Sequence, residues 1–404
     1  MAYMTKRAPS PAELPQSSIN RRSFVMGAAA VSLSAASGLV AETGLAASQG
    51  TPPGLASKRI LVGSGTPDGI LAFAWDAASG TLKPEGIAAV VSHSTWLDVS
   101  PDRRFLYVAC ELEEFQGKPT GAVASYGLAD GKLTPLTAVS STGKGTCHLT
   151  TDHTGRVVIA ANYGGGSAAS FVATDGKLGA AAWSEQYTGY PSHGPVADRQ
   201  EAAHAHFAVV SPDNHYAYIN DLGSDKIHIY KLNTTTGKLA AAGTFKAHAG
   251  AGPRTLHFHP DGKVAYSVNE LDCTVDVLQW NSADGSLQPV QQVKLLPGAT
   301  GGSTACDTVL TRDGHFAYFA NRGDDFLMSF RIDPATGKLT AMKRTSCGGK
   351  IPRNFALDPT ERWMLVANQQ SSNISVFARD PRTGELANEG KAFAAATPMC
   401  IVFV

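Results

Sequence analysis

The stretch His259–Glu270, HPDGKVAYSVNE, has the pattern of a β-hairpin, a turn of Pro, Asp and Gly that leads into an apolar strand. Similar phrases recur along the chain. They are SPDRRFLYVACE (100–111), DHTGRVVIAANY (152–163), SPDNHYAYINDL (211–222), TRDGHFAYFANR (311–322) and DPTERWMLVANQ (358–369). A hairpin pattern that is repeated at a regular spacing along the sequence predicts a repeat protein in which every unit forms the same small sheet.

A second phrase, a strand that ends in a Gly-x-Leu turn, alternates with the first. Its glycines are Gly80, Gly131, Gly176, Gly237, Gly285, Gly337 and Gly384, separated by 51, 45, 61, 48, 52 and 47 residues. A period of about 50 residues with four short strands is typical of a β-propeller blade. No helical periodicity of useful length lies between the strands, which disfavours a fold of alternating strands and helices.

The two ends of the chain explain why seven Gly-x-Leu phrases accompany six complete hairpin phrases. The sequence from Arg59 lacks a first strand, and PMCIVFV (Pro398–Val404) resembles a first strand with nothing after it. We therefore predict an all-β fold, a seven-bladed β-propeller of residues 58–404. The C-terminal strand is expected to pair beside Ile60–Gly63 in the N-terminal blade and to close the ring, which removes an exposed sheet edge.

Composition limits the classes of partner. The 404-residue chain is 43% hydrophobic, enough for a sizeable core, and its 34 Lys and Arg balance its 34 Asp and Glu. A net charge of zero gives no general attraction to nucleic acid or to an anionic membrane. None of the six cysteines belongs to a CxxC pair, so the sequence predicts no metal site, and cysteine spacing alone assigns no disulfide.

The N-terminus has the pattern of a targeting segment. Arg21 and Arg22 precede an Ala-rich, moderately apolar run through Val40, which resembles a bacterial twin-arginine export signal. We interpret residues 1–46 as this signal and residues 47–57 as a linker. A mitochondrial transit peptide and an uncleaved anchor are the alternatives. The expected partner is the twin-arginine export machinery, and the expected location is the periplasm or the exterior, with no stable membrane anchor after processing.

The outer ends of the hairpins carry chemistry. Because the two strands are antiparallel, the start of the first and the end of the second lie at one end of a blade. Seven positions before the turn Asp or its equivalent are Thr95, Cys147, His206, Arg254, Cys306 and Arg353, and alignment of PMCIVFV with HAHFAVV adds Cys400. Nine positions after it are Glu111, Tyr163, Leu222, Glu270, Arg322 and Gln369. Both sets should line one mouth of the central channel, where Arg254 and Glu270 face each other.

Three arginines at this mouth, Arg254, Arg322 and Arg353, indicate an anion site in a chain without net charge. The planar guanidinium fork suits carboxylate or phosphate. His206 and Glu270 beside these cations are suited to proton transfer, and with Arg254 they are the predicted catalytic residues. The structural alternative is that Arg254 and Glu270 form only an ion pair between two strands.

Three further residues are candidates for substrate binding, together with Arg322 and Arg353. His204 precedes His206 by two residues and should point the same way, since strand side chains alternate with a period of two. His148 lies one place off the inner set, and Glu111 belongs to the outer one. We interpret the cysteines of the inner set as small residues that fill the channel rather than as ligands of a Cys/His metal site.

Four segments resemble the seven-bladed lactonase family, which includes bacterial propeller-type 6-phosphogluconolactonases and fungal carboxy-muconate lactonizing enzymes. They are CHLTTDHTGRVVIAANYGGGSAASF, HAHFAVVSPDNHYAYINDLGSDKIHIY, GPRTLHFHPDGKVAYSVNELDCTV and IPRNFALDPTERWMLVANQQSSNISVF. The resemblance implies lactone chemistry without a metal or organic cofactor. It carries the family's proposed His, Arg and Glu onto His206, Arg254 and Glu270. A further family Arg falls on Arg322 or Arg353.

Two features depart from the family pattern. The early blade reads ACE at Ala109–Glu111, where members usually show an Asn before the Glu, and an export signal is unexpected for a cytoplasmic pentose-phosphate substrate. The expected function is hydrolysis of a sugar lactone with an anionic group, by a carboxylic-ester hydrolase similar to 6-phosphogluconolactonase. His206 or Glu270 would activate water, and Arg254 would stabilise the oxyanion. The alternatives are a muconate-type lactonizing cyclase and a propeller that binds a ligand without turnover.

Overall fold

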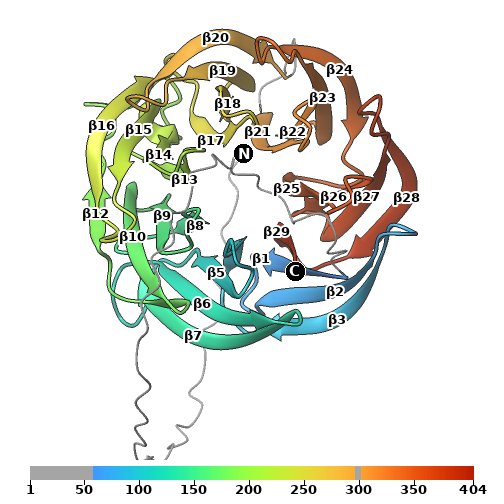
Figure 1. The fold of residues 1–404 in the computed structure, drawn as a ribbon, viewed down its shortest axis with the longest axis horizontal. Coiled ribbons are helices and arrows are strands. Elements are labelled where there is room, and N and C mark those ends of the chain that lie inside the picture. Colours follow the sequence, from blue (N-terminus) through green and yellow to red (C-terminus); the bar gives the residue numbers. More distant parts are fainter. Residues whose placement is uncertain (1–57, 296–301) are drawn as a thin grey trace, which may run out of the picture. The chain divides into compact units, whose positions relative to one another are not determined.

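Small antiparallel sheets form a ring in the computed structural model of the protein, which describes residues 58–295 and 302–404 (Figure 1). The export signal expected at 1–46 and the linker at 47–57 lie outside the described residues. Six sheets have four strands and one has five, so the fold is the predicted all-β seven-bladed propeller. In the described part of the chain the one helix is the short 3-10 turn η1 (Leu222–Ser224), and no helix there has the length and apolar character needed to cross a membrane.

Each blade has four main strands, which are described here in order from the central channel to the outside of the ring. The innermost strands are β4 (Ser94–Val99), β8 (Thr146–Thr151), β13 (Ala205–Val210), β17 (Pro253–Phe258), β21 (Thr304–Leu310), β25 (Pro352–Leu357) and β29 (Pro398–Phe403). The second strands are β5 (Phe105–Cys110), β9 (Val157–Asn162), β14 (Tyr216–Asp221), β18 (Val264–Asn269), β22 (Phe316–Arg322), β26 (Trp363–Asn368) and β1 (Arg59–Ser64).

The remaining strands form the outside of the ring. The third strands are β6 (Ala122–Ala129), β10 (Ser167–Thr174), β15 (Lys226–Leu232), β19 (Thr274–Trp280), β23 (Phe326–Ile332), β27 (Asn373–Arg379) and β2 (Ile70–Asp76). The outermost strands are β7 (Lys132–Ser140), β12 (Trp183–Gln186), β16 (Leu239–Lys246), β20 (Leu287–Lys294), β24 (Leu339–Ser346), β28 (Leu386–Ala394) and β3 (Thr81–Ala89). The short β11 (Lys177–Leu178) pairs with β10 beside β12 and gives that blade its fifth strand.

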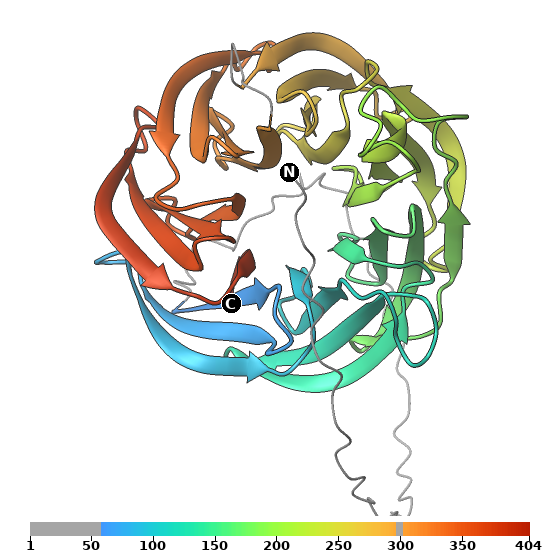
Figure 2. The same cartoon turned by 180° about the vertical axis from the view of Figure 1, so that it is seen from behind.

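One blade combines strands from both ends of the described chain. β29 pairs antiparallel with β1, with Leu61 opposite Val402 and Val62 opposite Ile401. Figure 2 shows the same ring from behind, with the red C-terminal strand beside the blue N-terminal blade. This is the pairing that the incomplete first and last repeats predict. β29 therefore supplies the innermost strand of a blade whose order, β29-β1-β2-β3, matches that of the other blades.

The repeated Tyr and Gly of the two sequence phrases connect neighbouring blades. Tyr266, fully buried in β18, donates its hydroxyl to the carbonyl of Gly337 in the next blade at 2.8 Å. Gly285 takes a φ of +77° in the same kind of turn, and a Cβ there would lie 2.6 Å from the ring of Tyr216 in the preceding blade. Glycine is the residue that combines a left-handed φ with so close a contact. The repeat therefore encodes the interface between blades as well as the blade itself.

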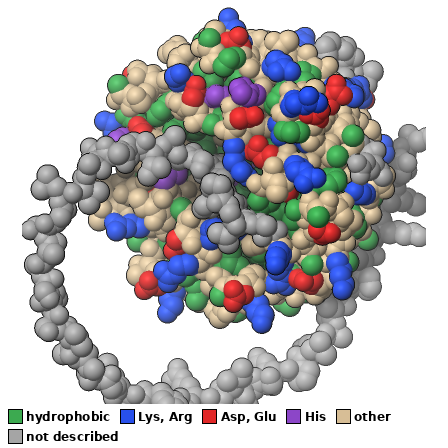
Figure 3. Space-filling model, turned by 45° about the vertical axis from the view of Figure 1, so that its right-hand side comes forward, with side chains coloured by type: hydrophobic (Ala, Val, Ile, Leu, Met, Phe, Trp, Pro, Cys, Tyr) green, Lys and Arg blue, Asp and Glu red, His purple; other side chains and the backbone are tan. Residues whose placement is uncertain are grey.

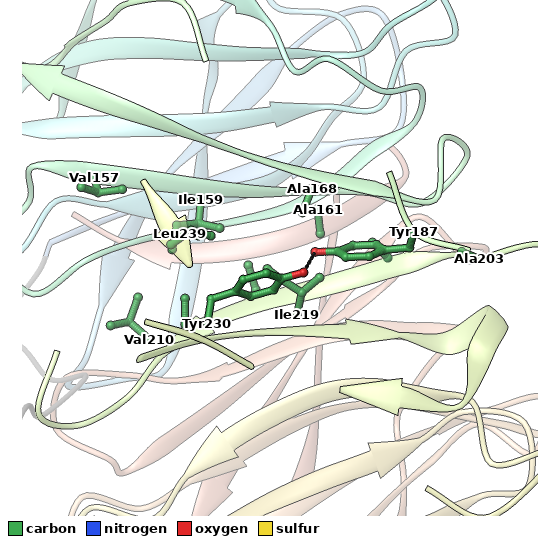
Figure 4. Close-up of a cluster of buried hydrophobic side chains, with 13 residues drawn as sticks. Val157, Ile159, Ala161, Ala168, Tyr187, Ala203, Val210, Ile219, Tyr230 and Leu239 are labelled. Atoms are coloured by element: carbon green, nitrogen blue, oxygen red, sulfur yellow. Dashed lines mark hydrogen bonds between the residues drawn. The ribbon is translucent and has the colours of Figure 1, made fainter. Parts of the chain in front are cut away.

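The hydrophobic core is divided among the interfaces between blades. One buried cluster, drawn in Figure 4, contains Ile159 of β9 and Ile219 of β14, and within it the hydroxyls of Tyr187 and Tyr230 meet at 3.1 Å. Because each sheet packs between two others, β9 and β14 are buried along their whole length. Such strands have continuous apolar sequences instead of an alternating pattern.

The surface in Figure 3 has charges of both signs. On this face Lys and Arg are interspersed with Asp and Glu, and hydrophobic side chains are scattered among them. The sequence has the same balance of charge. A face without a broad field of one sign does not select anions, so a selective anion site requires a local cluster of cations.

Candidate functional site

A β-bulge in every inner strand turns a residue toward the channel. In β17 the register passes from Pro253 opposite Asn269 to Thr255 opposite Val268, which leaves Arg254 unpaired. The residues omitted from pairing in this way are Thr95, Cys147, His206, Arg254, Cys306 with Asp307, Arg353 and Met399. All of them line one small cavity of about 20 Å³ at the centre of the ring. Bulges commonly re-aim side chains beside active sites, and here they build the inner wall of the site.

Met399 completes this inner set, and the expectation of Cys400 is wrong by one residue. Pro398 precedes Met399 as Pro253 precedes Arg254, so the C-terminal strand aligns with β17. Cys400 lies instead in an apolar cluster between blades. The position of the last strand could not be predicted from a hairpin turn, because the sequence has no turn after Val404.

Arg254 and Glu270 meet at the mouth, as their positions in the hairpin predict. Nη1 of Arg254 donates to Oε2 of Glu270, and the two side chains are 6% and 1% exposed. The same Nη1 contacts Nε2 of His206 at 2.5 Å. An arginine keeps its proton, so His206 accepts at Nε2 and carries its own proton on Nδ1. Arg254 therefore joins the other two predicted catalytic side chains.

Glu270 is shared by three guanidinium groups. Its Oε1 lies 2.9 Å from Nη2 of Arg322 and 2.6 Å from Nη2 of Arg199, while Arg254 holds Oε2. Burial by itself raises the pKa of the Glu270 carboxyl, but the charges of Arg322 and Arg254 outweigh burial and hold the pKa well below its usual range. Glu270 is therefore a carboxylate at neutral pH that fixes the positions of three cations.

Arg353 and Glu111 form a second, looser pair at the mouth. Nη2 of Arg353 lies 3.6 Å from Oε2 of Glu111, whose side chain is 32% exposed. Together these ion pairs contain four guanidinium groups and two carboxylates, an excess of two positive charges. The predicted anion site is thus a cluster of cations with incomplete neutralisation.

His206 is the neutral member of the cluster. Burial, followed by the charge of Arg254, holds the pKa of His206 well below its usual value. Its Nδ1 has no hydrogen-bond partner among the described residues, nor have Nε of Arg254 and Nε of Arg322. Buried donors without acceptors are costly.

The other two predicted histidines take different places. His204 lies at the mouth, where its ring stacks on Tyr163 with the centroids 4.4 Å apart. His148 lies in the channel wall between the rings of Trp96 and Phe207, with 3% of the residue exposed. Burial holds the pKa of His148 well below its usual value, so it is neutral. The structure therefore brings His204 to the mouth, whereas His148 belongs to the aromatic layer of the channel.

Two further side chains belong to the mouth. The repeat places Tyr163 there, although it was not among the predicted site residues, whereas Arg199 was missed by sequence reasoning. Tyr163 contacts His206 edge-on, with ring centroids 5.5 Å apart, and its hydroxyl accepts a hydrogen bond from Arg199 at 3.1 Å. Arg199 lies outside the repeats, in the connection from β12 to β13, and reaches Glu270. The longest spacing between repeats, 61 residues, signals an insertion at this point. Because the inserted segment is not part of a repeated unit, the position of Arg199 at the mouth could not be predicted from the repeats.

The cysteines act as packing residues. All six are buried and free. Burial raises the pKa of the Cys147 thiol to about 12, and that of Cys400 likewise. A thiol with such a pKa stays protonated and is a poor nucleophile or ligand. Throughout residues 58–295 and 302–404, no group of three or more His, Cys, Asp and Glu side chains is arranged to hold a metal ion.

Comparison with known proteins identifies the family. Residues 59–403 match the family described as lactonase, 7-bladed beta-propeller. The chain belongs to this lactonase family. It is 33% identical to the 6-phosphogluconolactonase of Bacillus subtilis (strain 168) over 344 residues, which cover 84% of this chain and 95% of the relative. The resemblance to the seven-bladed lactonase family that the sequence indicated is thereby confirmed.

Solved structures of this lactonase family have the same fold. The periplasmic gluconolactonase of Pseudomonas aeruginosa is 33% identical, with a TM-score of 0.79 over 86% of this chain and 98% of that one. A putative 6-phosphogluconolactonase from Bacteroides fragilis is 32% identical, with the same TM-score and the same coverage. Each of these similarities covers 86% of this chain and almost the whole of the solved structure.

Proposed function

We propose that this member of the lactonase family hydrolyses the ring ester of a sugar lactone that bears an anionic group, as a 6-phosphogluconolactonase would. The main support is that one nitrogen of Arg254 contacts both the neutral His206 and the carboxylate of Glu270. An oxyanion stabiliser (Arg254), a base (His206) and a carboxylate that fixes the stabiliser (Glu270) are then in contact. Relatives named 6-phosphogluconolactonase in Bacillus subtilis and Formosa agariphila support the same chemistry.

The reaction begins with an exchange of one hydrogen-bond acceptor of Arg254. The lactone carbonyl oxygen replaces His206 Nε2 as the acceptor of the Arg254 Nη1 proton. Nε2 then accepts a proton from a water molecule, whose oxygen attacks the carbonyl carbon. Arg254 stabilises the oxyanion of the tetrahedral intermediate. When the ring C–O bond breaks, the ring oxygen takes the proton from Nε2, and the hydroxy acid leaves a neutral His206.

Electrostatics favours His206 over Glu270 as the base. Both oxygens of Glu270 are occupied by guanidinium groups, so neither is free to take a proton from a water molecule. A protonated His206 beside Arg254 is unfavourable, so His206 passes its proton on to the departing oxygen. Glu270 keeps Arg254 in place, and the cations at the mouth attract the anionic group of the substrate.

The test is a panel of sugar lactones, with and without phosphate or carboxylate groups, monitored by proton release with the purified protein. We expect turnover of at least one anionic lactone. Conversion of a muconate-type carboxylate into a lactone, without hydrolysis of any sugar lactone, would favour the cyclase instead. Tight binding without turnover of any compound would contradict an enzymatic function.

We also propose that the protein is exported by the twin-arginine pathway. The support is Arg21 and Arg22 ahead of an uncharged run, together with a 33% identical relative that is described as periplasmic. Replacement of both arginines by Lys should retain the precursor in the cytoplasm. Normal periplasmic accumulation of the double variant, measured by cell fractionation, would contradict this proposal.

A further inference from the structure

Residues 187–203 of the connection between β12 and β13, termed the mouth loop, are fixed at both ends. Its first residue, Tyr187, and its last, Ala203, belong to the same buried cluster, and both are labelled in Figure 4. The hydroxyl of Tyr187 contacts that of Tyr230, and its backbone N–H donates to the carbonyl of Gly166 at 2.9 Å. The mouth loop is thus held to the core where it leaves the fold and where it returns.

A buried carboxylate fastens the middle of the mouth loop. Asp225 is 3% exposed and accepts hydrogen bonds from the Tyr190 hydroxyl at 2.5 Å and from Gln200 Nε2 at 2.8 Å. It also accepts the backbone N–H of Gly252 at 2.7 Å. Since Gly252 lies two residues before Arg254, one carboxylate ties the mouth loop to the strand that carries the proposed oxyanion stabiliser. The loop therefore presents its side chains in a defined position.

Arg199 of the mouth loop is held by one of its nitrogens. Nη2 contacts Oε1 of Glu270 at 2.6 Å and the hydroxyl of Tyr163 at 3.1 Å. Within the described residues, Nε and Nη1 of Arg199 make no hydrogen bond or ion pair. The Arg199 side chain is 33% exposed, against 6% for Arg254 and 14% for Arg322. Among the cations on Glu270, Arg199 is the one that a ligand reaches first from solvent.

We infer that Arg199 determines specificity for a phosphorylated substrate by gripping its phosphate through Nε and Nη1, while Nη2 remains on Glu270. Arg254 and Arg199 occupy opposite oxygens of Glu270, so the carbonyl and the phosphate of one lactone would lie on two sides of that carboxylate. The fork of a guanidinium matches phosphate oxygens. The ion pairs of the mouth contain more positive than negative charge, which favours the negative charge of a phosphate monoester.

The inference rests on the proposed lactonase function, and its test compares gluconolactone with the same lactone phosphorylated on its terminal hydroxyl. We expect Arg199→Gln to lower kcat/KM for the phosphorylated lactone about 10- to 100-fold, mainly through KM, as loss of charge-assisted hydrogen bonds implies. Turnover of the neutral lactone should change less than about threefold. The matched control is Arg312→Gln, since Arg312 is also about one-third exposed, at 38%, and also pairs with a glutamate, Glu361. This control should leave both rates unchanged.

Equal losses on both lactones in Arg199→Gln would show that Arg199 only positions Glu270, and would overturn the inference. Undiminished preference for the phosphorylated lactone would overturn it as well. If the wild-type protein hydrolyses neither lactone, the proposed function fails, and calorimetric titration with inorganic phosphate then decides the inference separately. Weaker phosphate binding by Arg199→Gln than by wild type and Arg312→Gln supports it, and equal binding by all three proteins contradicts it.

Discussion

A single guanidinium organises the site at the scale of residues. The bulge in β17 turns Arg254 into the channel, and its Nη1 reaches both His206 and Glu270. Taking such charges out of water costs several kcal/mol per ion, and replacement of buried ion pairs by apolar groups is often neutral or stabilising. We therefore expect this cluster to serve catalysis more than stability.

The first prediction follows from that expectation. Glu270→Gln and Arg254→Ala should each abolish most turnover of the best lactone while the ring remains folded. Removal of an oxyanion donor typically lowers kcat about 100- to 1000-fold, and Gln keeps the shape of Glu270 but no longer neutralises the three arginines. Steady-state kinetics measures the loss, and circular dichroism checks the fold. Near-normal turnover combined with a lower melting temperature would show that the pair is only a strap between two strands.

The second prediction concerns pH. Because burial and Arg254 hold the pKa of His206 well below its usual value, this base takes up a proton at lower pH than an ordinary histidine does. The acidic limb of kcat/KM should therefore lie well below the value of about 6.5 that an unperturbed histidine gives. Initial rates between pH 5 and 7.5, corrected for spontaneous hydrolysis, test this expectation. A limb near 6.5 would mean that His206 is not the base or is not buried in this way.

At the scale of elements, blades are joined by contacts that the two sequence phrases share. The Tyr of the second strand donates to the Gly carbonyl of the next blade in three successive places, Tyr218 to Gly285, Tyr266 to Gly337 and Tyr318 to Gly384. Each tyrosine is fully buried, so its hydroxyl needs this acceptor. The glycine turns are therefore part of the interface between blades, not only connections between strands.

The third prediction separates backbone conformation from packing. Gly285 and Gly117 have nearly equal φ values, +77° and +74°, but a Cβ at Gly285 would lie 2.6 Å from the Tyr216 ring, whereas no atom lies within 4 Å of one at Gly117. Alanine at either position should lower the free energy of unfolding by about 1–2 kcal/mol, because its φ is left-handed. Overpacking against Tyr216 should lower it by about a further 1–3 kcal/mol at Gly285. Denaturant unfolding measures both. Equal losses would mean that the turn moves away from Tyr216 without cost.

At the scale of the whole molecule, the ring depends on its last strand. β29 covers the inner edge of β1, and Arg103 of the adjacent blade donates to the carbonyl of Phe403 at 3.0 Å. Without β29 the edge of β1 would be open, and an open edge promotes aggregation. The blade that joins both ends of the chain is therefore the one whose loss opens the circle.

The fourth prediction is that deletion of Pro398–Val404 unfolds or opens the ring, seen as a large fall in melting temperature. A second variant keeps the test specific. In it the deleted residues precede Arg59, joined by a copy of the turn Ser211–His215, which lets the strand pair with β1 as a hairpin like those of the other blades. This variant should recover most of the lost stability. A truncated protein with an unchanged melting temperature would contradict the role of β29.

The seven blades, the shared mouth and the meeting of Arg254 with Glu270 could all be predicted from the amino-acid sequence. Each follows from local rules, the turn chemistry of a hairpin and the antiparallel pairing that places its two ends together. Arg322 and Arg353 were found in the same way, because they occupy fixed positions in a repeated unit. Because every repeated unit has the same strand register, the distance of a residue from the hairpin turn predicts its place in each blade that has such a turn.

Features that lie outside the repeat, or that depend on neighbouring blades, emerged from the folded ring. It placed Met399 rather than Cys400 on the inner wall, since the last strand is registered by pairing with β1 and not by a turn. It brought Arg199 to Glu270 through a loop fastened by Asp225. It also left His206 neutral, because burial and the charge of Arg254 act only once the blades close around them. Such effects are long-range in sequence, and their energy depends on the distances that the ring imposes.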